Sequence, residues 1–157
     1  MDRITRVAVA LGSNLGDRHA HLNHAVARLQ TLLRRLQVSR YRETVPVGIS
    51  GPQRMFLNAA AVGDTSLTAG GLLEALLGIE RERGRERPTV NAPRTLDLDL
   101  ILYGDARIDE PDLTVPHPRF RERLFVLEPL AEIAPEMVDP VSGSTVRDLL
   151  SALNTLG

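Results

Sequence analysis

The chain has 157 residues, 43% of them hydrophobic and 25% charged, and these proportions are ordinary for a globular protein. We expect one domain over residues 1–157, because this length suits a single hydrophobic core. The formal net charge of −1 disfavours a general polyanion-binding protein, and the absence of cysteine excludes disulfides, thiolate zinc sites and a cysteine nucleophile.

The first half of the chain alternates between strand and helix patterns. Residues 7–11 predict a buried strand. Apolar residues then recur every three or four positions from Leu22 to Leu36, which predicts an amphipathic helix of about five turns. A second strand is expected within residues 38–44. Residues 45–54 contain two prolines and two glycines, so we expect a loop there.

The second half repeats this pattern. Residues 56–62 predict a third strand, and a second helix follows over residues 72–79, capped by Ser66 or Thr68. Residues 95–103 alternate and give the clearest strand pattern of the chain. An apolar run over residues 124–130 and a short helix near residues 146–153 follow.

The order strand, helix, strand, strand, helix, strand predicts an α+β fold. We expect a ferredoxin-like βαββαβ core with a mainly antiparallel sheet, helices packed on one face, and a C-terminal extension.

Asp97 and Asp99 give the strongest chemical signal. On a strand, alternate side chains share a face, so the neighbouring leucines point into the core and the two carboxylates point away from it, with Cα atoms about 6.5 to 7 Å apart. Two such carboxylates repel each other, and a divalent cation relieves that conflict. Mg²⁺ takes oxygen ligands and keeps water or phosphate oxygens in its shell. The alternative is the solvated polar face of an edge strand that holds no metal.

Arginine supplies all 19 basic residues, so the chain has neither a Schiff-base lysine nor the lysine of a P-loop. Guanidinium groups beside the aspartate strand suit a polyphosphate. The alternative is a solvated helix end with Glu80, Glu82 and Glu86 as local partners. The arginines of this cluster are Arg81, Arg83, Arg85, Arg87 and Arg94.

Histidine occurs at one isolated position and in one group of three. His117 stands between two prolines, which fix its backbone, and its ring can donate a hydrogen bond to a phosphate. The alternative is a turn histidine without a partner. We expect His19, His21 and His24, within the first helix, to face solvent.

Five sequence blocks, in this order and spacing, resemble the 6-hydroxymethyl-7,8-dihydropterin pyrophosphokinase family over about residues 6–153. The resemblance implies transfer of the β,γ-pyrophosphoryl group of ATP to the hydroxymethyl oxygen of a reduced pterin, with release of AMP, in tetrahydrofolate biosynthesis. The blocks are Leu11–Gly16, Phe56–Ala59, Glu80–Arg85, Ala92–Asp99 and Pro116–His117.

The resemblance also implies roles for individual residues. Asp97 and Asp99 would hold two Mg²⁺ ions, and together with Arg85 and Arg94 they would form the catalytic set. The residues that would bind ATP are Glu80, Arg85, Arg94, Leu100, Thr114, Val115, His117 and Arg123. The residues that would bind the pterin are Thr44, Val45, Val47, Phe56, Asn58 and Phe125.

The chain departs from the family pattern at two positions. Asn91 stands where many members have a tryptophan, in a loop that is about one residue shorter. Phe56 replaces a tyrosine of some members, which keeps the ring and removes a hydroxyl.

Two other function classes fit parts of the sequence. A ferredoxin-like module that binds RNA or a regulatory ligand would need exposed aromatic residues, and aromatic residues are only 3% of the chain. A metal-dependent phosphodiesterase could use the same aspartate pair.

We expect small-molecule substrates, no nucleic acid and a monomer. No run of about 18 uncharged apolar residues occurs, so we expect no membrane span. The first nine residues lack the apolar region of a signal peptide, so we expect a cytoplasmic protein.

Overall fold

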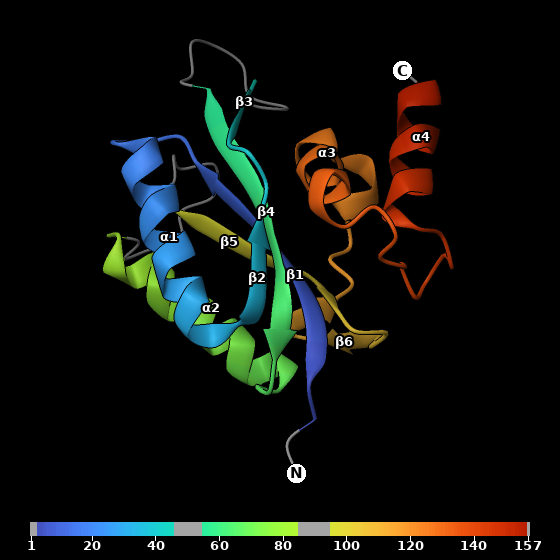
Figure 1. Cartoon of the computed structure of the whole chain (residues 1–157), viewed down its shortest axis with the longest axis horizontal. Coiled ribbons are helices and arrows are strands. Elements are labelled where there is room, and N and C mark those ends of the chain that lie inside the picture. The colour runs from blue at the N-terminus through green and yellow to red at the C-terminus, as the bar shows by residue number, and fades with distance from the viewer. Residues whose placement is uncertain (1–2, 46–54, 85–94, 157) are drawn as a thin grey trace.

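The computed structural model describes residues 3–45, 55–84 and 95–156 (Figure 1). Figure 1 shows a sheet with helices on both sides. The elements are β1 (Thr5–Ser13), α1 (Arg18–Leu32), β2 (Arg34–Val38), β3 (Arg42–Thr44), β4 (Phe56–Thr65), α2 (Ala69–Glu82), β5 (Asp97–Tyr103), β6 (Ile108–Glu110), β7 (Leu113–Val115), the 3-10 helix η1 (Phe120–Glu122), α3 (Leu124–Ile133) and α4 (Val146–Leu156).

The main sheet has the strand order β2-β4-β1-β5, and every neighbouring pair is antiparallel. β3 pairs with the first residues of β4, and β2 pairs with its later residues. β2 and β3 together therefore take the place of the second strand of a βαββαβ unit. This order confirms the ferredoxin-like topology expected from the sequence.

Side chains of β1 alternate between two hydrophobic clusters. Val7, Val9 and Leu11 belong to the cluster that includes residues of α1 and α2. Ala8 belongs to the cluster that includes residues of α3 and α4, and Ala10 packs against that cluster. The sheet therefore contributes apolar surface to both faces, and both faces have to be covered.

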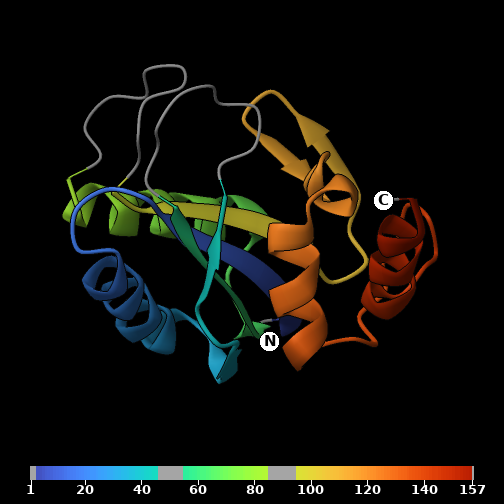
Figure 2. The same cartoon turned by 90° about the horizontal axis from the view of Figure 1, so that it is seen from above.

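The helices of the βαββαβ unit lie on one face, as expected, and the C-terminal extension covers part of the other face. α3 packs against β4, and Figure 2 shows α4 outside α3, farther from the sheet. Among the residues that the structure describes, none of the helices combines the length and apolar character that crossing a bilayer requires.

The first helix is shorter than the leucine spacing predicts. It ends at Leu32, and the extended backbone of Leu33 (φ −122°, ψ 138°) leads directly into β2, which contains Leu36. The predicted second strand is also divided, because β2 ends at Val38 and β3 begins at Arg42. Leucines spaced three residues apart also fit a turn followed by a strand, so periodicity alone placed this boundary wrongly.

Thr68 is the N-cap of α2, which decides between the two candidates expected from the sequence. Its hydroxyl accepts a hydrogen bond from the backbone N–H of Gly71 at 3.0 Å. The cap satisfies one of the backbone donors that the first turn of a helix leaves without a partner.

We predict that Thr68→Ala lowers the free energy of unfolding by about 1 kcal/mol, because the Gly71 amide loses its acceptor. Urea denaturation measures the change. Ser66→Ala is the matched control, since Ser66 is exposed and precedes the cap, and it should change stability by less than about 0.5 kcal/mol. Equal losses from the two substitutions would contradict the capping assignment.

Candidate active site

A pocket of about 740 Å³ lies on the face of the sheet that also carries α3. Its walls come from β1, β3, β4 and β5 and from the stretch that runs from Arg119 through η1 into α3. The residues that line it are Ala10, Leu11, Gly12, Thr44, Val45, Phe56, Asn58, Asp97, Asp99, Arg119, Glu122, Arg123, Leu124, Phe125 and Glu128.

The register of the sheet builds the floor of this pocket. Gly12 pairs with Asn58 on one side and with Asp97 on the other, and Ala10 pairs with Asp99. Directly opposed residues of antiparallel strands place their side chains on the same face. An amide and a carboxylate therefore stand on either side of a residue that has no side chain.

Gly12 keeps this floor open. A Cβ atom at this position would lie 3.1 Å from Nδ2 of Asn58 and 3.9 Å from the ring of Phe56. The first distance is shorter than ordinary van der Waals contact, so any larger residue would displace Asn58. A glycine is therefore needed here because side chains of β4 approach the backbone of β1 closely.

The aspartate strand alternates as the sequence predicts up to Leu100. Leu96, Leu98 and Leu100 are buried in the core beside α1 and α2, whereas Asp97 and Asp99 are half-buried and line the pocket. Leu102 does not continue the pattern: it packs with residues of α3 and α4, because the register between β1 and β5 shifts between Ala8 and Val9. β5 is an edge strand of the sheet, but its two carboxylates face a cavity and not open solvent. The described residues contain no group of three or more His, Cys, Asp or Glu side chains that could hold a metal ion. A cation bound by this pair would therefore need further ligands from substrate or water.

Glu80 lies on the opposite side of the sheet from the pocket. It belongs to α2, is 1% exposed, and its Oε2 accepts a hydrogen bond from the backbone N–H of Leu98 at 2.7 Å. Leu98 stands between Asp97 and Asp99. The carboxylate of Glu80 thus fixes the backbone of β5 where it carries the aspartate pair.

His117 is tied to β5 through its backbone. Its N–H donates to the carbonyl oxygen of Ile101 at 3.0 Å, and its Nδ1 accepts from the backbone N–H of Arg119 at 3.2 Å. Burial lowers the pKa of His117, the nearby Arg123 lowers it further, and Asp97 opposes the shift. The ring is therefore neutral at pH 7, and because Nδ1 accepts, Nε2 carries the proton and can donate.

The residues expected to bind a pterin come together in the pocket. Thr44, Val45, Phe56, Asn58 and Phe125 all line it. The Thr44 hydroxyl donates to Oδ1 of Asn58, which orients the amide, and the two rings lie on different elements of the wall. The remaining expected member, Val47, lies outside the described residues.

The residues expected to bind ATP are more scattered. Arg123 lines the pocket, with its guanidinium carbon 5.5 Å from the centre of the Phe125 ring. Leu100 and Val115 are buried and Thr114 is exposed, and none of these three lines the pocket. Arg85 and Arg94, which are the two expected catalytic arginines, lie outside the described residues. Asn91 also lies outside them.

Several lining residues were missed by the motifs. Arg119, Glu122 and Leu124 follow His117 in a charged stretch that the sequence marks only by its composition. Glu128 lies one helical turn after Leu124 on α3, which was expected only as an apolar run. Their proximity to β5 depends on tertiary packing, which no local pattern shows.

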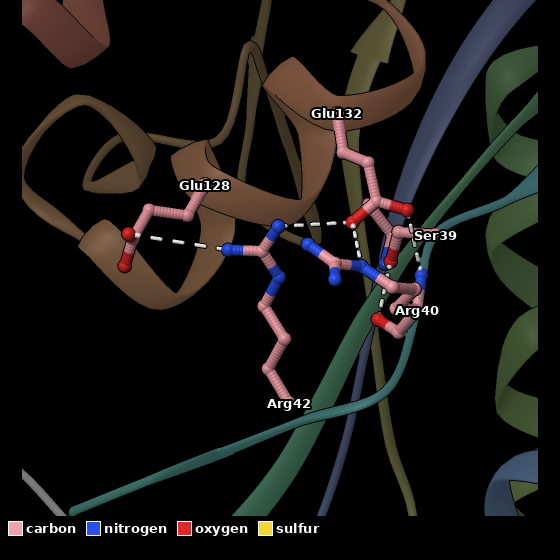
Figure 3. A network of polar contacts seen from close by, with 6 residues as sticks. Ser39, Arg40, Arg42, Glu128 and Glu132 are labelled. Carbon is pink, nitrogen blue, oxygen red and sulfur yellow. Dashed lines mark hydrogen bonds and ion pairs between the residues drawn. The ribbon is translucent and has the colours of Figure 1, made fainter.

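A network of ion pairs joins two walls of the pocket (Figure 3). Oε1 of Glu132 on α3 accepts from Arg42 of β3 at 2.9 Å and from Nε of Arg40 at 3.3 Å, and its Oε2 accepts from the Arg40 backbone N–H at 2.9 Å. The second carboxylate facing Arg42 is that of Glu128, at 3.9 Å. The Arg40 amide and then the Arg42 guanidinium lower the pKa of Glu132. The network therefore holds β3 against α3.

The histidines of α1 do not all face solvent, which corrects the expectation. Nδ1 of His21 accepts from Nε of Arg83 at 2.9 Å, and Nε2 of His24 lies 2.7 Å from Glu82, so both rings contact the end of α2. His19 is exposed, as expected. The difference arises because α1 and α2 pack side by side, which the helical pattern of α1 alone cannot show.

Comparison with known proteins identifies the family of this chain. Residues 8–135 match the sequence profile described as 7,8-dihydro-6-hydroxymethylpterin-pyrophosphokinase. The chain belongs to this family. The profile covers well over half of the chain, including all of β3, β4 and β5 and most of β1.

Relatives of the pyrophosphokinase family match the chain over most of its length. A protein of Methylorubrum extorquens named 2-amino-4-hydroxy-6-hydroxymethyldihydropteridine pyrophosphokinase is 44% identical over 156 residues, which is 98% of this chain and 97% of the relative. A Bacillus subtilis protein of the same name is 47% identical over 131 residues, covering 82% of this chain and 78% of the relative.

Solved structures agree on the fold. The crystal structure of wild-type Plasmodium falciparum HPPK-DHPS superposes with a TM-score of 0.74 at 15% identity over 97% of this chain. The chain spans 45% of that solved chain, so the likeness supports the fold of this part alone.

We predict that Glu80→Ala lowers the free energy of unfolding by about 1 to 3 kcal/mol, because the buried N–H of Leu98 loses its acceptor. Chemical denaturation measures the loss. Glu74→Ala is the matched control, since Glu74 is an exposed glutamate of the same helix and should change stability by less than about 0.5 kcal/mol. A loss from Glu80→Ala no larger than that of the control would contradict the anchoring role.

Proposed function

We propose that this pocket transfers the β,γ-pyrophosphoryl group of ATP to the hydroxymethyl oxygen of 6-hydroxymethyl-7,8-dihydropterin and releases AMP. Family membership supports a pyrophosphokinase of folate biosynthesis with ATP as co-substrate. One observation carries the finer assignment: the pairing of Gly12 with both Asn58 and Asp97. It sets an amide and aromatic wall on one side of the floor and a carboxylate pair on the other.

The amide and aromatic wall suits the pterin. Phe56 and Phe125 present rings that can stack on a flat heterocycle. Asn58 keeps its NH₂ group as a donor while its Oδ1 accepts from Thr44 and retains a second lone pair. The edge of a pterin offers both donors and acceptors, so an oriented amide can match it, and Thr44 serves to hold that orientation.

The carboxylate pair suits Mg²⁺. Asp97 and Asp99 share one face of a rigid strand and both line the pocket, and their oxygens are hard ligands that Mg²⁺ prefers. Two carboxylates do not fill an octahedral shell, which fits ions that share their remaining positions with triphosphate and water. When bound there, two Mg²⁺ ions would neutralise the charge of the triphosphate.

The arginine side of the pocket suits the phosphates. Arg119 and Arg123 line it. His117 is not among the residues that line the pocket, and we propose on the family resemblance that its Nε2–H donates to a phosphate. We include Arg85 and Arg94 in the phosphate-binding and catalytic set on the family resemblance, together with the other expected ATP contacts Leu100, Thr114 and Val115. Glu80, also expected to bind ATP, is buried on the other side of the sheet, and we propose that it serves the site by holding β5 and not by touching the nucleotide.

In the reaction, the hydroxymethyl oxygen forms a bond to the β-phosphorus while the bond from that phosphorus to the α,β-bridging oxygen breaks. The bridging oxygen leaves with AMP, and the hydroxyl proton goes to water. The side chains position the two reactants and balance the shifting charge, which is what phosphoryl-group transfer chiefly requires. We assign no general base.

The direct test is an assay in which the pterin and Mg²⁺ are each left out in turn. AMP should form from ATP only when 6-hydroxymethyl-7,8-dihydropterin and Mg²⁺ are both present. A phosphodiesterase would not need the pterin, and a binding module would form no AMP at all. We further propose that the enzyme is a monomer and cytoplasmic, and that it binds small molecules and not nucleic acids.

We predict that Asp97→Ala or Asp99→Ala reduces turnover by at least about a hundredfold with the fold intact, because each removes a charged ligand from the site of charge transfer. Turnover is measured as AMP release at saturating Mg²⁺, and the fold by thermal denaturation. Asp109→Ala removes an exposed carboxylate of β6 and should retain full activity. Near-normal activity of either pocket variant would overturn the metal assignment.

We predict that Gly12→Ala weakens pterin binding roughly tenfold, because the added Cβ displaces the Asn58 amide. Binding of 6-hydroxymethylpterin is measured by calorimetry in the presence of a non-hydrolysable ATP analogue. Gly78→Ala is the matched control, because a Cβ there meets nothing within 4 Å. It should leave binding unchanged and stabilise α2 by up to about 1 kcal/mol. Unchanged affinity in Gly12→Ala would show that the floor tolerates a side chain.

A further inference from the structure

The arginine-bearing wall of the pocket depends on a contact outside the pocket. Arg119, Glu122, Arg123, Leu124 and Phe125 all line the cavity, whereas Arg121, in the middle of the same segment, does not. Its guanidinium meets Asp139 with two hydrogen bonds, from Nε to Oδ2 at 2.5 Å and from the terminal nitrogen to Oδ1 at 2.9 Å. Such two-pronged, charge-assisted pairs fix both distance and orientation.

Asp139 is itself held rigidly. It is fully buried, and it also accepts from the Val141 N–H at 3.0 Å and from the Ser142 hydroxyl at 2.6 Å. Its backbone closes the same turn, because its N–H donates to Ser144 and its carbonyl accepts from Gly143. Burial works to raise the pKa of Asp139, but the bonds from Arg121, Ser142 and Val141 outweigh burial and keep the pKa well below its ordinary value. The carboxylate is therefore charged at neutral pH.

A short chain of contacts connects the Arg121–Asp139 pair to Arg123. Phe120, fully buried, lies under the Arg121 guanidinium at 4.9 Å, and its carbonyl accepts from the N–H of Arg123 at 3.2 Å. The Arg123 carbonyl in turn accepts from the N–H groups of Val126 and Leu127 at the start of α3. The backbone of Arg123, a residue that lines the pocket, is thus fixed by its neighbours.

We propose that Arg121 and Asp139 are positioning residues that hold the Arg123 guanidinium against the phosphate side of the pocket. This inference rests on the proposed function, in which Arg123 contacts the triphosphate. Asp139 lies beyond residue 135, where the match to the family profile ends. In this proposal the turn after α3 acts on substrate binding through Arg121 and Arg123.

The test compares Arg121→Lys and Asp139→Asn. The first keeps the charge but cannot form the two-pronged pair, and the second keeps the size of the side chain but loses its charge. We expect both to weaken binding of a non-hydrolysable ATP analogue with Mg²⁺ by about tenfold, measured by calorimetry, and to raise the KM for ATP to match. The KM for the pterin should change less than about twofold.

Arg147→Ala is the matched control. Arg147 pairs with Glu136 in the same C-terminal extension, and both side chains are exposed. Its loss should leave both KM values unchanged. A role of Arg121 in stability alone would lower the melting temperature but leave the affinity of the folded protein unaltered, and that result would overturn the inference.

Arg123→Ala distinguishes the phosphate contact of Arg123 from the positioning role of Arg121 and Asp139. If it leaves binding of the ATP analogue unchanged, the proposed contact of Arg123 with the triphosphate is wrong. If it weakens binding but Arg121→Lys and Asp139→Asn do not, the positioning role is wrong and the proposed function stands. In the Arg123→Ala background, Arg121→Lys should weaken binding by less than about twofold further, because the group through which it acts is gone. A full tenfold loss in that background would also overturn the inference.

Discussion

The pairing of β1 with both β4 and β5 is the constraint on which the rest of the site depends. β1 is a central strand, and its residues from Val7 to Gly12 have an opposed partner on both sides. Side-chain orientation alternates along a strand, and the register therefore decides which residues of three strands share a face. Here the register groups Asn58, Gly12 and Asp97 in one row. The leucines next to these residues along the three strands are buried on the other side of the sheet.

One face of the sheet forms a closed core, and the other face forms the pocket. On the side of α1 and α2, large apolar residues fill a closed core. On the other side, small residues of β1 leave space, and α3 covers only part of the surface. Charged contacts then hold the covering parts in place: Arg42 with Glu132 between β3 and α3, and Arg121 with Asp139 behind the arginine-bearing wall. Both lie beside the cavity and leave its interior free for ligands.

Sequence patterns predicted the parts of the protein that depend on local spacing. Alternation placed Asp97 and Asp99 on the face opposite Leu96, Leu98 and Leu100, and the order of elements predicted the strand order of the sheet. Alternation failed at Leu102, because the register between β1 and β5 shifts just before it. Periodicity failed where one pattern fits two structures, as at Leu33 and Leu36, where a helix ends and a strand begins. The partners of Glu80 and Arg121 could not be predicted, since each lies at least 18 residues away along the chain.

The register of β1 also restricts how the chain can vary in length. Inserting or deleting one residue within Thr5–Ser13 would turn each following side chain to the opposite face, so that Leu11 would fill the pocket floor and Gly12 would leave a hole in the core. Variation in length among functional members of this lineage should therefore collect in the connections between strands. An indel inside β1 that no bulge absorbs, in contrast to the irregularity opposite Ala8 and Val9, would remove the row formed by Asn58, Gly12 and Asp97.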